Sequence, residues 1–152
     1  EEELEYTQNY MNMQQIQSEK ENLYTAEAEE EVLGCKIPIL CIQIFVENSM
    51  KYARKNKEEI RILVRAGKWK TKGEEKLWIT IDDSGEGFTQ EQIKQLQEEN
   101  DRVYKRGKDH GIGIANVRQR LKILYGDQAN ISFSNNEKGG AHIKIDLPFC
   151  EK

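Results

Sequence analysis

Two neighbouring segments that alternate apolar and polar residues restrict the fold of this chain more than any other feature. Residues 59–66 and 76–82 place their apolar side chains at every second position: Ile60, Ile62 and Val64, then Leu77, Ile79 and Ile81. This period of two predicts two strands, each with one covered face and one wetter face. The polar turn 67–73 is expected to join them.

The segments before this pair predict two helices and an edge strand. Residues 1–18 are typical of a polar helix, and we expect it to continue a helix that begins upstream. Residues 22–29 alternate and suit an edge strand. A second helix is predicted from Pro38 to Lys55, because proline is favoured in a first helical turn. The candidates for its buried face are Leu40, Phe45, Val46, Met50 and Ala53.

The segments after the pair predict two more helices and a hairpin. Thr89 and Gln92 have the spacing of a capping box for a short helix. A helix over 113–124 is expected to stop at Gly126, and strands at 131–134 and 142–147 would form a closing hairpin. The layout predicts an α+β fold, a two-layer α/β sandwich with helices on one face of a mixed, mostly antiparallel sheet.

Composition limits the class of protein. The 152 residues suit a single domain, and 33% charged residues with 37% hydrophobic ones are typical of a globular protein with a well-solvated surface. A net charge of −4 argues against general nucleic-acid binding. No apolar run approaches the roughly 18 residues of a membrane span, and no signal peptide is visible, so we expect a cytoplasmic segment.

The first of three motifs lies in the predicted second helix. Glu47-Asn48-Ser49-Met50-Lys51-Tyr52-Ala53 places an amide oxygen, an ammonium group and an aromatic ring near one face. Mg²⁺ prefers oxygen ligands and is often held by one or two protein groups together with substrate phosphates. Asn48 is therefore a candidate magnesium ligand, and Lys51 a candidate phosphate contact.

The second motif, Asp83-Ser84-Gly85-Glu86-Gly87-Phe88, follows a predicted strand. A carboxylate at Asp83 can accept a hydrogen bond from an exocyclic amine such as adenine N6. Gly85 and Gly87 would let the backbone approach a flat base. Strand alternation sends Asp82 to the opposite face, so Asp83 is the preferred candidate.

The third motif, Gly111-Ile112-Gly113-Ile114-Ala115-Asn116-Val117, begins a helix, where exposed N–H groups attract phosphate. The charged segment before it is expected to form a lid within residues 89–110. Taken singly, a surface helix, a plain turn and a flexible loop would explain the three motifs better. Together they predict an ATP pocket, and the spacing fits neither a Rossmann fingerprint nor a Walker P-loop.

These three motifs and the terminal Gly139-Gly140 hairpin resemble the GHKL ATPase superfamily, most closely the ATP-binding catalytic domain of LytS/YesM-type sensor histidine kinases. The resemblance covers nearly the whole chain and implies the Bergerat fold. It implies that Asn48 binds Mg²⁺ and that Asp83 reads adenine between Gly85 and Gly87. Nucleotide contacts from Lys51, Tyr52, Gly111, Gly113, Ile114 and Asn116 follow from the same motifs. Arg120 matches the family's Asn-Val-x-x-Arg stretch without an assigned role.

The resemblance implies transfer of the γ-phosphoryl group of Mg-ATP to a histidine on a separate dimerisation segment, with Glu47 as a base. A response regulator would be an indirect partner, and the parent protein is expected to be a homodimer in the plasma membrane. Neither His110 nor His142 stands in a phosphoacceptor context. Ala141 replaces the threonine usual after the Gly-Gly pair, which would remove a hydroxyl near the adenine and could weaken ATP binding.

Two alternatives stay open from the sequence. One is an ATP hydrolase of the gyrase, chaperone or mismatch-repair branch. Such enzymes carry a water-activating glutamate one helical turn before the metal-binding asparagine, where this chain has Ile44. The other is a non-catalytic nucleotide-binding or docking module.

Overall fold

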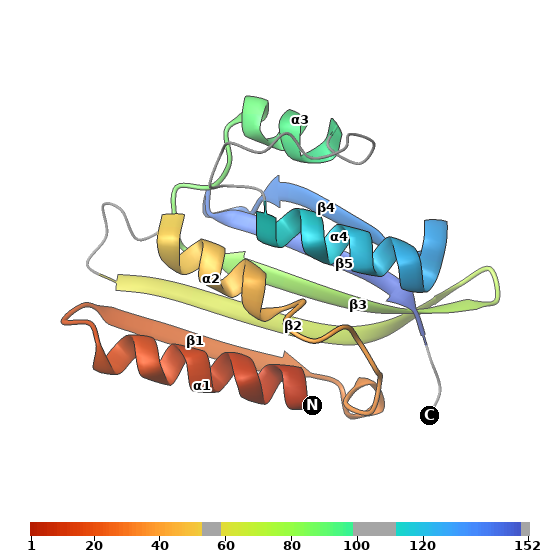
Figure 1. The fold of residues 1–152 in the computed structure, drawn as a ribbon, viewed down its shortest axis with the longest axis horizontal. Helices are drawn as coiled ribbons and strands as arrows, with labels where there is room; N and C mark the ends of the chain where they lie inside the picture. The colour runs from red at the N-terminus through yellow and green to blue at the C-terminus, as the bar shows by residue number, and fades with distance from the viewer. Residues whose placement is uncertain (53–58, 99–111, 150–152) are drawn as a thin grey trace.

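The computed structural model describes residues 1–52, 59–98 and 112–149, which form one mixed sheet with a layer of helices on one face (Figure 1). In chain order the elements are α1 (Glu2–Ile16), β1 (Glu21–Ala28), α2 (Gln43–Tyr52), β2 (Glu59–Thr71), β3 (Glu74–Asp83), α3 (Gln90–Glu98), α4 (Ile112–Tyr125), β4 (Asn130–Asn135) and β5 (Ala141–Pro148). Short 3-10 turns occupy Glu30–Val32 and Gly126–Gln128.

The five strands lie in the order β1-β2-β3-β5-β4. β1 pairs with β2 in parallel, and the other three neighbouring pairs are antiparallel. This confirms the predicted two-layer α+β sandwich with a mostly antiparallel sheet. It also confirms the edge strand, which runs from Glu21 to Ala28 beside β2.

The β2–β3 hairpin is longer than predicted. The two strands stay paired up to Thr71 and Glu74, so the prediction of a turn over 67–73 is wrong for all but its tip. Lys72 and Gly73 form the connection with φ values of 49° and 85°. Positive φ at both central residues is what a two-residue type I′ hairpin requires, and glycine supplies it without strain.

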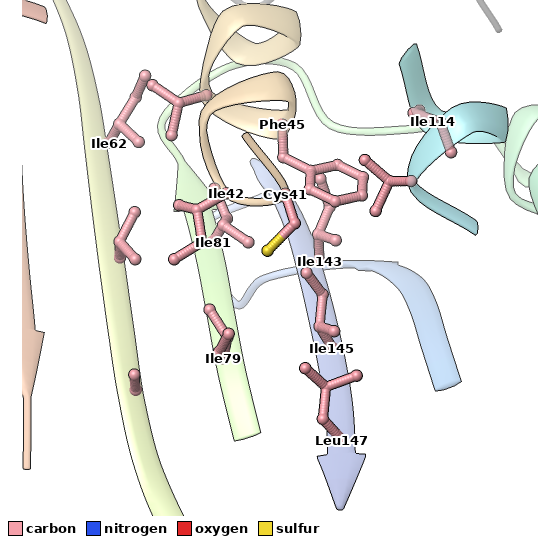
Figure 2. Close-up of a cluster of buried hydrophobic side chains, with 14 of the residues drawn as sticks. Cys41, Ile42, Phe45, Ile62, Ile79, Ile81, Ile114, Ile143, Ile145 and Leu147 are labelled. Carbon is pink, nitrogen blue, oxygen red and sulfur yellow. The ribbon is translucent and has the colours of Figure 1, made fainter. Parts of the chain in front are cut away.

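The hydrophobic core lies between the sheet and the helices. Figure 2 shows Phe45 of α2 pointing toward the sheet, with Ile79 and Ile81 of β3 and Ile143 and Ile145 of β5 beneath it. Phe45, Val46 and Ile145 are fully buried. The alternation found in the sequence thus corresponds to the covered face, as predicted.

The start of α2 differs from the prediction. The helix begins at Gln43, not Pro38, and Leu40 lies before it with a φ of 62° and 41% of its surface exposed. Leu40 therefore does not belong to the buried face, whereas Phe45, Val46 and Met50 do. A leucine in this left-handed conformation cannot be part of a right-handed helix. The predicted end at Lys55 and the burial of Ala53 lie outside the described residues.

α1 confirms the predicted first helix, but two of its three buried residues are polar. Its buried residues are Glu3, Thr7 and Met11, whereas Met13 and Ile16 are 59% and 86% exposed. Whether α1 continues a helix from upstream stays a prediction. Neither α1 nor any other described helix has the length and apolar character that a membrane span needs.

The second half of the chain follows the prediction closely. Thr89 and Gln92 form a reciprocal capping box at the start of α3, with N–H···O distances of 2.8 and 3.2 Å. α4 ends just before Gly126, which has a φ of 58°. β4 and β5 form the predicted hairpin. Of the predicted lid, 89–98 is described and 99–110 lies outside the described residues.

Candidate nucleotide-binding site

The residues of the first motif lie on α2, which packs on the sheet beside α4 (Figure 1). Glu47 and Asn48 are half-buried, whereas Lys51 is exposed and lies 5.4 Å from the centre of the Tyr52 ring. Gln43 donates a 2.8 Å hydrogen bond to Oε1 of Glu47, one helical turn later. Among the described residues, none forms a hydrogen bond with the side chain of Asn48.

Asp83, the last residue of β3, is buried between α2 and the β4–β5 hairpin, with 7% of its surface exposed. Its Oδ2 accepts a 2.8 Å hydrogen bond from Oγ of Ser49. Its Oδ1 accepts from the backbone N–H of Gly85 at 2.9 Å and of Ala141 at 3.1 Å. A carboxylate offers about four lone-pair positions, so the described protein groups leave one on Oδ2 for a further donor.

Asp82 lies on the opposite face of the sheet from Asp83, as the strand alternation predicts, whereas the role of Asp83 toward a base stays a prediction. Asp82 places its Oδ1 2.7 Å from Nδ1 of His142. Nη2 of Arg65 lies 3.7 Å from its Oδ2. The structure therefore brings Asp83, and not Asp82, to the α2 side of the sheet.

The loop after Asp83 is fixed by the β4–β5 hairpin. Asn135 accepts from the N–H of Phe88 at 2.7 Å and donates to the carbonyl of Phe88 at 2.9 Å. Gly87 has a φ of 74°, and a Cβ there would collide with Oδ1 of Asn135 and with the carbonyl oxygen of Gly139. The positive φ and the lack of space for a Cβ therefore require glycine at position 87, whether or not a ligand is bound.

The hairpin also approaches the backbone of Asp83. Nδ2 of Asn136 donates to the Asp83 carbonyl at 3.0 Å, and its Oδ1 accepts from the N–H of Gly140 at 2.9 Å. A Cβ on Gly140 would overlap the Asp83 carbonyl. Gly140 therefore allows the close contact that brings the N–H of Ala141 to the Asp83 carboxylate.

The third motif lies at the start of α4, next to α2. A Cβ built on Gly113 would lie 2.9 Å from Cγ2 of Ile44, so this glycine allows the two helices to pack closely. Ile114 is 8% exposed and belongs to the core, whereas Asn116 is exposed. Gly111 lies outside the described residues. The nucleotide contacts expected of these residues stay predictions.

Three residues that organise the site were missed by the sequence analysis. Ser49 joins α2 to Asp83, and Asn135 and Asn136 hold the glycine loop. The Asn135-Asn136 pair before Gly139-Gly140 is a turn signal that could have found the last two. Ser49 lies inside the first motif, but no local pattern indicates its partner.

The donor set fits a magnesium ion that is bound mainly by phosphates. Across residues 1–52, 59–98 and 112–149, no group of three His, Cys, Asp or Glu side chains could hold a metal ion alone. Asn48 offers a single amide oxygen, which is the kind of protein ligand that Mg²⁺ accepts when a substrate supplies other oxygens. The arrangement around Asp83 likewise offers an acceptor suited to an amino group of a base.

The sequence matches known proteins over nearly its whole length. Residues 37–151 match the family described as "Histidine kinase-, DNA gyrase B-, and HSP90-like ATPase". The sensor protein LytS of Enterococcus faecalis is 29% identical over 149 residues, which are 96% of this chain and 24% of LytS. The sensor histidine kinase YesM of Bacillus subtilis is 27% identical, over 97% of this chain and 23% of YesM. The chain thus spans about a quarter of the length of these curated relatives.

Solved structures show the same fold. The catalytic domain of the histidine kinase ThkA, in a nucleotide-free form, matches with a TM-score of 0.71 at 15% identity, covering 99% of this chain and 94% of that one. The mycobacterial sensor histidine kinase MprB matches with a TM-score of 0.62 at 15% identity, over 99% and 95% of the two chains. With the motif geometry and the family match over residues 37–151, the chain belongs to the histidine kinase-, DNA gyrase B- and HSP90-like ATPase family.

Proposed function

We propose that this chain is the ATP-binding catalytic domain of a two-component sensor histidine kinase. It would bind Mg-ATP and transfer the γ-phosphoryl group to a histidine on a separate dimerisation segment of the same protein. The observation that carries the proposal is Asp83, whose carboxylate is oriented by Ser49, Gly85 and Ala141 and keeps one acceptor position open. The similarity to LytS and YesM supports the kinase branch of the family.

The residues of α2 have distinct roles in this proposal. Asn48 would hold Mg²⁺, which neutralises charge on the phosphates when it is bound. Lys51, exposed at the end of α2, would contact phosphate as a point charge. Glu47 would accept the proton that the attacking imidazole loses, with Gln43 fixing its Oε1. Because phosphoryl transfer depends on positioning and charge neutralisation, these groups suffice without a covalent intermediate on this chain.

Ile44 argues against the hydrolase alternative. An apolar side chain packed against Gly113 stands where that branch would need a glutamate to activate water. Glu47 lies three residues later, about 60° from Ile44 around the helix, and adjoins Asn48. The isolated chain is therefore expected to bind ATP with little hydrolysis.

A calorimetric titration of Asn48→Ala against the parent, with and without Mg²⁺, tests the metal site. The variant should lose most of the Mg²⁺-dependent affinity for ATP and remain folded, because Asn48 makes no hydrogen bond to another described residue. Equal affinity of the two proteins for Mg-ATP would reject Asn48 as the ligand.

Competition between ATP and GTP tests the base contact. Guanine presents a carbonyl where adenine presents an amine, and two acceptors facing each other cost about 1–3 kcal/mol, so ATP should bind at least roughly tenfold more tightly. Asp83→Asn should reduce this preference, and Asp82→Asn is the matched control on the other face. Comparable affinity of the parent for both nucleotides would show that Asp83 does not read the base.

A transfer assay tests the activity and the proposed partners. Mixed with the histidine-bearing segment of its own parent protein, the chain should transfer ³²P from [γ-³²P]ATP to a histidine, giving an acid-labile, base-stable product. A response regulator would then receive the group, and the parent protein would act as a homodimer in the plasma membrane. Steady ATP hydrolysis without transfer would favour the hydrolase branch, and tight binding with neither reaction the non-catalytic module.

A further inference from the structure

The segment that leads into α2 is held from the α1 side by one buried carboxylate. Oε2 of Glu3 accepts a 2.8 Å hydrogen bond from the N–H of Leu40. Its Oε1 accepts from the N–H of Ile42 at 3.0 Å and of Gln43 at 3.3 Å. Gln43 is the first residue of α2, and Leu40 and Ile42 lie just before it, where N–H groups have no partner within the helix. Glu3 is therefore a cap for α2 that comes from another helix.

The environment of Glu3 makes this cap hard to replace. Glu3 is 7% exposed and forms no ion pair with any residue that the structure describes. Its charge is balanced by N–H groups and by the positive end of α2, which attracts anions. The same charge, after burial as the larger cause, raises the pKa of Cys41 and of Tyr24 to about 12.

The opposite side of the segment is held by α4. Nη1 of Arg120 donates to the carbonyl of Ile39 at 2.7 Å, and the hydroxyl of Tyr125 donates to the carbonyl of Lys36 at 3.2 Å. Between the two attachments, Leu40 adopts its φ of 62°. A leucine keeps such a conformation only where its surroundings enforce it. Within residues 39–43, Glu3 thus binds three N–H groups and Arg120 binds one carbonyl.

We propose that Glu3 and Arg120 are positioning residues that fix α2 relative to α1 and α4, and so set the place of Asn48. The part that concerns ATP rests on the proposed function. Asn48 follows Gln43 by five residues on one helix, so a shift at the first turn moves Asn48 with it. A displacement of about 1 Å at a distance from the chemistry can cost two orders of magnitude in rate. Any movement of α1 along its axis would reach the nucleotide site through Glu3.

Hydrogen exchange of the ligand-free protein tests the attachment. Glu3→Gln keeps the size of the side chain but replaces one acceptor oxygen with the NH2 donor of an amide, and Arg120→Gln removes the guanidinium group. In both variants the amide protons of residues 40, 42 and 43 should exchange roughly tenfold faster than in the parent. This is the change expected from the loss of one hydrogen bond to a charged group. Glu5→Gln on α1 and Lys122→Gln on α4 change exposed residues and are the matched controls. Exchange equal to that of the controls would overturn the inference.

Titration with ATP, with and without Mg²⁺, tests the consequence for the site. Glu3→Gln should bind Mg-ATP at least roughly threefold more weakly, and the ratio of affinities with and without Mg²⁺ should fall because Asn48 has moved. A general loss of stability would lower both affinities and leave the ratio unchanged. Faster exchange with an unchanged ratio in a protein that binds Mg-ATP would overturn the inference.

Failure of the proposed function is recognised separately. If the parent chain binds no ATP, that function is wrong, and the positioning is judged by exchange over residues 45–50 of α2 alone. Faster exchange there in Glu3→Gln, with both control variants unchanged, supports the inference. An unchanged rate over those residues overturns it.

Discussion

Asp83 should contribute more to the stability of this domain than a carboxylate at the end of a strand normally does. In Asp83→Ala, the N–H groups of Gly85 and Ala141 lose their acceptor while both residues stay buried. Each buried group without a partner costs about 1–3 kcal/mol, so the two amides together should cost about 2–6 kcal/mol. The hydroxyl of Ser49 also loses its partner, which places the expected loss in the upper half of that range.

Asp83→Asn separates the charge from the geometry. Its carbonyl oxygen can still accept from Gly85 and Ala141, and its amide group can donate to Oγ of Ser49. Because charge-assisted hydrogen bonds are about twice as strong as neutral ones, we expect a loss of about 1–2 kcal/mol. Urea unfolding followed by circular dichroism measures both variants against the parent.

Asp82→Ala is the internal control for this series. Asp82 is the neighbouring residue, but its partners His142 and Arg65 lie on the face of the sheet away from α2 and are partly exposed, and Nδ2 of Asn136 approaches its Oδ1 only to 3.5 Å. Its removal should cost roughly 1 kcal/mol, because the side chains of Arg65 and His142 are 47% and 28% exposed and can turn to water. If Asp82→Ala destabilises the protein as much as Asp83→Ala does, the assignment of Asp83 as the organising residue is refuted.

Three further predictions concern other parts of the structure. Burial and then the charge of Glu3 raise the pKa of Tyr24 from 10.0 to about 12, so the folded state holds this proton more tightly than the unfolded state. The resulting stability is complete below pH 10 and is lost as the pH approaches 12, and Tyr24→Phe should flatten the fall in urea midpoint over that window. Leu40→Val should cost more than about 1 kcal/mol because a β-branched residue resists positive φ, whereas Leu40→Gly should cost less, as thermal unfolding would show. Thr89→Ala should lower the stability of α3 by about 1 kcal/mol, detected as faster amide exchange over residues 90–98 without a change in the β2–β3 hairpin.

Local patterns in the sequence were enough to predict most of the fold. The period of two identified the strands because their covered face is uniformly apolar, and it also separated Asp83 from Asp82. The capping box at Thr89 and the glycine after α4 mark helix ends by short-range hydrogen bonds and backbone freedom. Such signals depend only on residues a few positions apart, so the strands and helix ends that they predict agree with the structure.

The errors arose where partners distant in the sequence decide the local structure. Pro38 suggested the start of a helix, but Glu3, almost forty residues earlier, fixes the chain so that α2 begins at Gln43. The predicted β2–β3 hairpin is shorter than the observed one. The residues beyond Gly67 are mostly polar and suggested a turn, although the strands stay paired as far as Thr71. The hydrogen bond between Ser49 and Asp83 was missed for the same reason, because its two residues lie far apart in the sequence and no local pattern indicates it.

The parallel pairing of β1 with β2 affects where this domain can be cut. The family match begins at residue 37, which would suggest a shorter domain without α1 and β1. Such a truncation would expose the outer edge of β2 along eight residues, including Ile60, Ile62 and Val64. An uncovered edge strand with apolar side chains is a template for strand pairing between molecules. Fragments that begin at residue 37 should therefore aggregate at concentrations where the longer chain stays dispersed.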